Sequence, residues 1–96
     1  DDAFIRRFQS IIHFPLPSTS KRLELWQKGF PKPLKFADDI DLPTIASRYE
    51  LSGAEIMNVV QFCCLLVLER GDETLQLADL MVGMRNEYDK NGRLMR

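Results

Sequence analysis

Apolar residues recur at helical spacing along four stretches of the chain, and capping residues mark where these stretches begin or end. A helix is predicted at about 19–29, after the hydroxyls of residues 18–20 and with Gly29 as its stop. A shorter helix is predicted at about 42–49, capped by Asp41. Its apolar stripe follows the i, i+3, i+4, i+7 pattern and consists of Leu42, Ile45, Ala46 and Tyr49.

A capping box opens the third helix. In Ser52-Gly-Ala-Glu55 the hydroxyl takes one first-turn amide, and the glutamate side chain reaches back to another. Residues 59–68 contain a single polar side chain. We therefore expect neighbours to cover this helix on most sides, with residues 65–66 in the core. Gly71 is expected to end it.

The remaining pattern completes a helical bundle. A fourth helix is predicted at about 77–89, with Asp79 in the first turn, where the helix dipole favours an acid. The Pro- and Lys-rich stretch 30–40 indicates a loop. Residues 10–14 are apolar and β-prone, and predict one strand that ends at Pro15. The fold class predicted is all-α, a four-helix bundle preceded by one short strand.

Composition and charge narrow the class of protein. The 96 residues allow one core, and 45% hydrophobic and 28% charged residues are ordinary for a globular domain. Lys and Arg number 13 and Asp and Glu 14, so no excess charge attracts nucleic acid or anionic lipid. The longest apolar stretch is about half of a membrane span. We therefore expect an excised cytoplasmic domain that contacts neither a membrane nor nucleic acid directly.

Metal-binding and catalytic residues are few. Cys63 and Cys64 are adjacent, which places them on different sides of a helix, and we interpret them as reduced, buried thiols. His13 is the single histidine, so a zinc site lacks ligands, and a structural role is the simpler interpretation. The acids in 38–41 lack the spacing of a calcium loop. With no GxxxxGK[ST] loop either, the sequence predicts no metal site and no stand-alone enzyme.

Two adjacent arginines, Arg6 and Arg7, stand between apolar residues before the predicted strand. Taken alone, they are explained as surface charge. In the same way, capping alone explains residues 52–55, and a bundle core alone explains Leu25 and Trp26. The order of these segments along the chain gives them a second interpretation.

This order resembles the end of the ATPase module of AAA ATPases, where the last part of the large nucleotide-binding subdomain is followed by a small helical lid. The segment up to residue 26 contains Asp-x-Ala-Phe-x-Arg-Arg-Phe, the predicted strand, Pro-x-Pro and Arg-Leu-x-Leu-Trp. Residues 41–58 read Asp-Leu-x-x-Ile-Ala-x-x-Tyr-x-Leu-Ser-Gly-Ala-x-Ile-x-Asn. The match is closest to bacterial proteins of the classical AAA branch. It divides the chain into 1–17, the end of the large subdomain, and 18–96, the lid.

The resemblance implies a role for five residues. Arg6 and Arg7 stand where the family places its arginine fingers, which act in trans on the γ-phosphate bound by a neighbouring subunit. Gly53 and Ala54 occupy the sensor-2 position, against the nucleotide bound by the same subunit. Leu25 falls where the family has an apolar residue against the adenine ring.

Cofactors and partners are implied in the same way. The parent protein is expected to bind ATP with Mg²⁺, to form a ring of subunits, expected to be a hexamer, and to remodel a protein substrate. The fragment alone is expected to bind no cofactor tightly and to be catalytically silent, since the phosphate loop is absent. Gly29 and Gln76 depart from the family, which often has a ribose-side His and a capping Thr or Ser at these positions.

A non-enzymatic helical module that binds a partner helix in a groove is the alternative from a different class. A GxxxxGK[ST] motif about one large subdomain upstream would discriminate between the two readings. A nucleic-acid-binding helical domain is disfavoured by the near-zero net charge and by the lack of an Arg-rich recognition helix.

Overall fold

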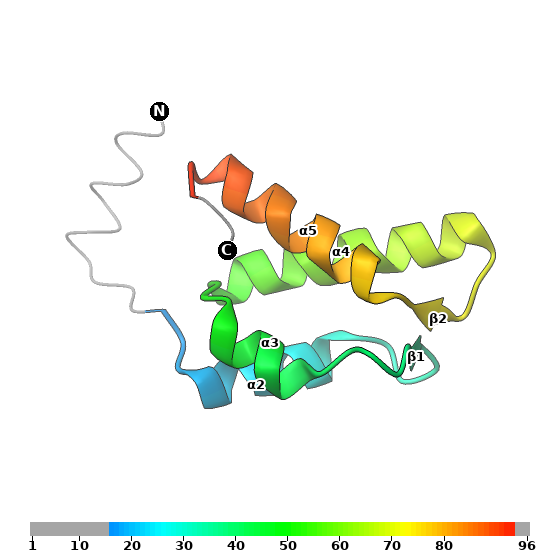
Figure 1. Cartoon of the computed structure of the whole chain (residues 1–96), viewed down its shortest axis with the longest axis horizontal. Coiled ribbons are helices and arrows are strands. Elements are labelled where there is room, and N and C mark those ends of the chain that lie inside the picture. Colours follow the sequence, from blue (N-terminus) through cyan, green and yellow to red (C-terminus); the bar gives the residue numbers. More distant parts are fainter. Residues whose placement is uncertain (1–15, 94–96) are drawn as a thin grey trace.

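The computed structural model describes residues 16–93, and within them four helices form two pairs stacked in two layers (Figure 1). In one layer α2 (Thr19–Gly29) packs against α3 (Leu42–Arg48), and in the other α4 (Gly53–Arg70) packs against α5 (Leu77–Lys90). Contacts between α2 and α4 join the layers. The predicted all-α, four-helix fold is confirmed, with helix boundaries that differ by at most one residue.

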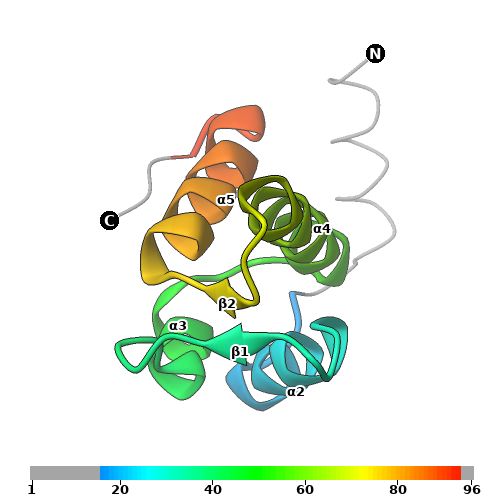
Figure 2. The same ribbon diagram turned by 90° about the vertical axis from the view of Figure 1, so that its right-hand side faces the viewer.

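A short parallel strand pair connects the two layers at one end of the molecule (Figure 2). β1 (Lys35–Phe36) lies between α2 and α3, and β2 (Thr74–Leu75) lies between α4 and α5. The backbone amide of Lys35 donates to the carbonyl of Glu73 at 2.9 Å. The prediction of a plain loop at 30–40 is wrong at these two residues, because a two-residue strand is too short to show an alternating pattern. The strand predicted at 10–14 lies outside the described residues.

Caps that were predicted from the sequence are confirmed at three helix ends. Ser52 and Glu55 form the reciprocal capping box of α4. Asp41 caps α3 by accepting from the amide and hydroxyl of Thr44, at 3.3 and 2.9 Å. Gly71 ends α4 in the left-handed conformation, with φ 68° and ψ 31°, which a glycine adopts without strain. Local hydrogen bonding therefore determines these boundaries.

Gly29 ends α2 as predicted, but it does so without the left-handed backbone conformation that glycine often adopts at a helix end. The residue after it, Phe30, continues in extended conformation, so no left-handed turn is formed. A Cβ atom on Gly29 would lie 3.2 Å from Val60 Cγ2, which is tighter than ordinary contact. Its lack of a side chain therefore allows α2 to approach α4 closely.

The core fills the space inside each helix pair and between the two layers. The predicted stripe of α3 faces this core, as do Leu80, Met84 and Tyr88 of α5. Phe30 lies 6.1 Å from Trp26, ring centre to ring centre, and meets Phe36 edge to face at 5.3 Å. The largest side chains without solvent exposure are Trp26, Leu51, Ile56, Leu75, Leu80, Met84, Val59 and Cys63.

The outer side of α4 is open to solvent. Leu65 is 59% exposed and Leu68 is 73% exposed. The expectation that neighbours cover this helix on most sides is therefore wrong, and neither Leu65 nor the half-buried Leu66 belongs to the core. A continuous apolar run gives no period from which a buried side can be told from an exposed one.

Arg22 is a buried charged residue that the sequence analysis did not single out. Its Nε donates to the carbonyl of Ala46 at 2.7 Å, which links α2 to α3. Its two terminal nitrogens donate to Pro17 O at 2.6 Å and to Thr19 Oγ1 at 3.0 Å. Three acceptors thus satisfy the guanidinium group, as a buried charge requires.

A second arginine, Arg70, forms a bidentate ion pair with Asp79, in the first turn of α5. Both oxygen–nitrogen distances are 2.9 Å. The carboxylate also accepts from the amide of Gln76 at 2.9 Å. Chiefly through the hydrogen bonds from Arg70, the pKa of Asp79 is lowered below its ordinary value.

We expect Asp79→Asn to make the protein less stable at pH 7 and to reduce its sensitivity to acid. A carboxyl whose pKa is lower in the folded state contributes stability above its unfolded-state pKa, and this contribution is lost as pH falls through the folded-state pKa. Urea melts at several pH values between about 7 and 3 should therefore show the two proteins converging as pH falls. Asp89→Asn, an exposed change on the same helix, is the control. A constant difference between wild type and Asp79→Asn would contradict the expectation.

Candidate functional site

The three predicted nucleotide-wall residues lie where α2 meets the beginning of α4. A Cβ atom on Gly53 would lie 3.8 Å from Leu25 Cδ1, an ordinary van der Waals distance. Leu25 and Gly53 are both half-buried, and Ala54 beside them is exposed. The structure thus brings Leu25 and Gly53 together, although they come from different helices, and leaves the first turn of α4 accessible beside them.

The first turn of α4 presents two unpaired backbone donors. Ser52 Oγ accepts from the amide of Glu55 at 3.2 Å, and Glu55 Oε1 accepts from the amide of Ser52 at 2.8 Å. Within residues 16–93 the amides of Gly53 and Ala54 have no acceptor, as expected at the start of a helix. Small side chains and free donors at a helix N-terminus allow a polar ligand to approach the backbone.

The end of α5 reaches the same region. Asn91 Nδ2 donates to Glu55 Oε2 at 2.7 Å and to the carbonyl of Glu87 at 2.8 Å. The hydroxyl of Tyr88 donates to the carbonyl of Glu50 at 3.2 Å. The sequence analysis missed these contacts, because hydrogen-bonding side chains far apart in the chain leave no periodic signal.

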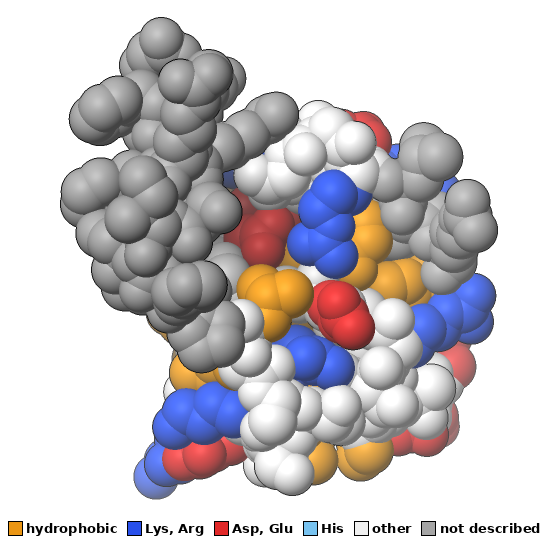
Figure 3. Space-filling model, turned by 90° about the vertical axis from the view of Figure 1, so that its left-hand side faces the viewer, with side chains coloured by type: hydrophobic (Ala, Val, Ile, Leu, Met, Phe, Trp, Pro, Cys, Tyr) orange, Lys and Arg blue, Asp and Glu red, His pale blue; other side chains and the backbone are white. Residues whose placement is uncertain are grey.

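Figure 3 shows the end of the molecule at which α4 begins and α5 ends. On the visible part of this face acidic and basic side chains are interspersed, with small groups of hydrophobic side chains between them. The mixed charge agrees with the near-zero net charge of the chain. Arg6 and Arg7, the predicted arginine fingers, lie outside the described residues.

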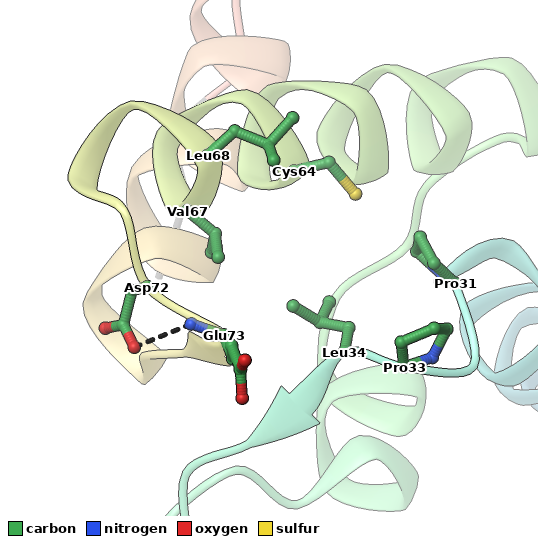
Figure 4. Close-up of a pocket in the computed structure, with 8 residues that line it drawn as sticks. All are labelled: Pro31, Pro33, Leu34, Cys64, Val67, Leu68, Asp72 and Glu73. Carbon is green, nitrogen blue, oxygen red and sulfur yellow. Dashed lines mark hydrogen bonds between the residues drawn. The ribbon is translucent and has the colours of Figure 1, made fainter.

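An apolar cleft of about 400 Å³ lies elsewhere, between the α2–β1 connection and the end of α4 (Figure 4). It contains none of the predicted site residues. The residues that line it are Pro31, Pro33, Leu34, Cys64, Val67, Leu68, Asp72 and Glu73. Its walls are mostly hydrophobic, so it offers little polar recognition.

The two cysteines are free, and neither is suited to nucleophilic chemistry at neutral pH. Burial, with a smaller contribution from the charge of Asp79, raises the pKa of Cys63 to about 12. Burial also raises the pKa of Cys64, which is half-buried. Both thiols therefore stay protonated at neutral pH, and the thiolate is the reactive form.

Between residues 16 and 93 no group of three or more His, Cys, Asp or Glu side chains is arranged to hold a metal ion. None of the helices in this part of the chain combines the length and the apolar character that a membrane crossing needs.

Several curated proteins are similar in sequence, whereas no protein-family model matches the chain. Katanin p60 ATPase-containing subunit A1 of Strongylocentrotus purpuratus is 37% identical over 71 residues, which cover 73% of this chain and 14% of that protein. Meiotic spindle formation protein mei-1 of Caenorhabditis elegans is 33% identical over 91 residues, covering 90% and 18%. ATP-dependent zinc metalloprotease FtsH 3 of Sphaerobacter thermophilus is 36% identical over 84 residues, covering 83% and 17%.

The chain therefore spans only 14–18% of the length of these relatives. Each match nevertheless covers most of the chain itself. Four helices with one short strand pair are consistent with the helical lid of AAA+ proteins. The homologues of this chain are thus katanin and FtsH AAA ATPases at modest identity, which supports the AAA ATPase family as its own.

Proposed function

We propose that this chain is the lid region of an AAA ATPase of the bacterial, classical type, and that residues 18–96 supply the base-side wall of its ATP site. The observation that carries the proposal is the proximity of Leu25 to Gly53 in the first turn of α4, where Gly53 is half-buried and Ala54 is exposed. Two of the relatives carry "ATPase" or "ATP-dependent" in their names, which supports ATP as the ligand.

The chemistry of this wall follows from its residues. Leu25 offers apolar surface against one face of a planar base. The amides of Gly53 and Ala54 point out of the helix end, where the helix dipole favours electron-rich groups. The triphosphate and Mg²⁺ would be held by a phosphate loop that this sequence does not contain. The chain alone therefore binds weakly and does not hydrolyse ATP.

The wider role extends this proposal to the whole protein. Residues 1–17 would form the end of the large subdomain, with Arg6 and Arg7 acting in trans on the γ-phosphate of a neighbouring subunit. A guanidinium group there neutralises charge that develops on the transferring phosphoryl group. In a cytoplasmic ring, expected to be a hexamer, hydrolysis would move the lid relative to its neighbours and so remodel a protein substrate.

An NMR titration of the 96-residue chain with ATP tests the proposed wall. We expect small shifts in fast exchange near Leu25, Gly53 and Ala54, with a Kd no tighter than about 1 mM, since a few apolar contacts barely exceed the cost of association. Micromolar binding would contradict the proposal, because it requires a phosphate site that the chain lacks. Shifts that avoid these three residues would contradict it too.

Gly53→Ala should separate ligand binding from fold stability. The new methyl group meets Leu25 at an ordinary distance, and alanine is the better helix former, so the free energy of unfolding should rise by up to about 1 kcal/mol. The same methyl group would stand where the ligand approaches the backbone, so the ATP-induced shifts should shrink. Gln61→Ala, an exposed change on the same helix, should leave the shifts unchanged. Undiminished shifts in Gly53→Ala would remove this turn from the site.

A non-enzymatic interaction module is the second candidate, and one observation favours it. The apolar cleft of Figure 4 lies beside Leu68, which is 73% exposed, so a partner has apolar surface to bury. An ATP titration without shifts at Leu25 or Gly53, and a longer sequence without GxxxxGK[ST], would favour this candidate.

A further inference from the structure

The turn that precedes α4 is attached to the end of α5 by side chains, at two points. The first is the carboxylate of Glu55, which is shared between the helices. Its Oε1 accepts from the amide of Ser52 within the capping box, and its Oε2 accepts from Asn91 Nδ2 at 2.7 Å. One carboxylate therefore connects the N-cap of α4 with the C-cap of α5.

The second point is the carbonyl of Glu50, just before the capping box. It accepts from the hydroxyl of Tyr88 at 3.2 Å and from Arg93 at 2.9 Å. The guanidinium carbon of Arg93 also lies 4.3 Å from the centre of the Tyr88 ring. Burial raises the pKa of Tyr88, so its hydroxyl keeps its proton and remains a donor at neutral pH.

Asn91 itself is held in place on α5. Its Nδ2 donates to the carbonyl of Glu87 at 2.8 Å as well as to Glu55. The Glu87 side chain makes separate contacts: it accepts from Asn58 Nδ2 at 3.0 Å and pairs with Lys90 at 2.6 Å. The donor that reaches Glu55 is thus oriented by a backbone carbonyl of α5.

We propose that the end of α5 positions the first turn of α4, with Asn91 as the positioning residue, and thereby sets the affinity of that turn for nucleotide. This inference rests on the proposed function, in which Gly53 and Ala54 follow directly after the turn that is held. Coupling between two sites is reciprocal. A ligand at the first turn of α4 should therefore change the environment of the Asn91 side-chain amide, although the two do not touch.

Amide hydrogen exchange of the nucleotide-free 96-residue chain tests the positioning role. In Asn91→Ala the amides of Ser52 and Glu55 should exchange about 3- to 10-fold faster, because the carboxylate that orders the capping box loses one donor. The amide of Cys63, in the middle of α4, should be unchanged and so reports any general loss of stability. Asn86→Ala is the matched control, because Asn86 is exposed on the same helix and no hydrogen bond of its side chain exists within residues 16–93.

A second variant keeps the size of the side chain. Asn91→Asp replaces the donor by a carboxylate facing Glu55, so exchange at Ser52 and Glu55 should be faster than in Asn91→Ala. Unchanged exchange at both amides in both variants would overturn the positioning role. Exchange that is equally faster at Cys63 would overturn it as well, since the effect would then be general instability.

An ATP titration of the same variants tests the link to nucleotide. In Asn91→Ala the shifts at Gly53 and Ala54 should be at least twofold smaller at the same ATP concentration, while Asn86→Ala should match wild type. Full-sized shifts in Asn91→Ala would overturn this link. Absence of shifts in the wild type itself would refute the proposed function and the link with it, whereas hydrogen exchange would still decide the positioning role.

Discussion

Leu80→Ala is expected to lower the free energy of unfolding by about 2–5 kcal/mol, whereas Leu65→Ala should cost less than about 1 kcal/mol. Leu80 has no solvent exposure, so its removal leaves a cavity in the core. Leu65 is 59% exposed on the outer side of α4, and water can fill the space that it leaves. Because a small domain has only about 5–10 kcal/mol of stability in total, the first variant should unfold at a much lower urea concentration.

The pair forms its own control, since both changes remove the same atoms from a helix. Equal losses would mean that the outer side of α4 is covered in solution. In that case the loss for Leu65→Ala should depend on protein concentration, because a covering partner copy binds by mass action. Equal losses at every concentration would contradict the burial described here.

Arg7→Ala should have a larger effect, in this case on catalysis. The variant is made in the whole ATPase, of which we propose that this chain forms the lid and the end of the large subdomain. ATP turnover should fall by roughly 10³–10⁵-fold, the range of arginine fingers in related GTPase systems, while ATP binding stays nearly intact. The reason is that a finger contacts the nucleotide of the neighbouring subunit and acts mainly in the transition state. Steady-state turnover and equilibrium binding of a fluorescent ATP analogue measure the two quantities separately.

Two further variants sharpen this experiment. Arg7→Lys keeps the charge but loses the planar, bidentate donor, so turnover should recover only in part. Arg85→Ala removes an exposed arginine of α5 and should leave turnover unchanged. A variant of Arg7 that loses ATP binding but keeps turnover per bound ATP would contradict a role in trans.

Much of the helical framework could be predicted because its signals are local. The capping box of Ser52 and Glu55, the cap of Asp41 and the left-handed Gly71 each involve residues within a few positions of one another. Helical spacing likewise gave the buried sides of α3 and α5, since polar residues there alternate with apolar ones.

The features that could not be predicted depend on segments that are distant in sequence. β1 and β2 are recognisable only as a pair, because neither is long enough to carry a pattern. The burial of Arg22 was not predicted, because its acceptor, the carbonyl of Ala46, lies on another helix. The exposure of Leu65 and Leu68 depends on the absence of a covering element among the described residues, which an apolar run cannot reveal.

The candidate site also contains some residues that could be predicted and others that could not. A resemblance pointed to Leu25 and Gly53, which the fold brings together, but no periodicity or spacing connects these two residues. The sequence analysis did not identify Asn91, because its hydrogen bond to Glu55 joins it to a different helix. The roles of Leu25, Gly53, Ala54, Arg6 and Arg7 toward ATP stay predictions.

The parallel pairing of β1 with β2 has a mechanical consequence. Without it, the α2–α3 pair and the α4–α5 pair would be two helical hairpins that touch mainly along α2 and α4, and such a contact acts as a hinge. Hydrogen bonds from Lys35 to Glu73 and from Ala37 to Leu75, both 2.9 Å, attach the two layers at a second place. A body held at two separate places resists bending, so torque applied to one layer is passed to the other and the whole unit can work as a lever.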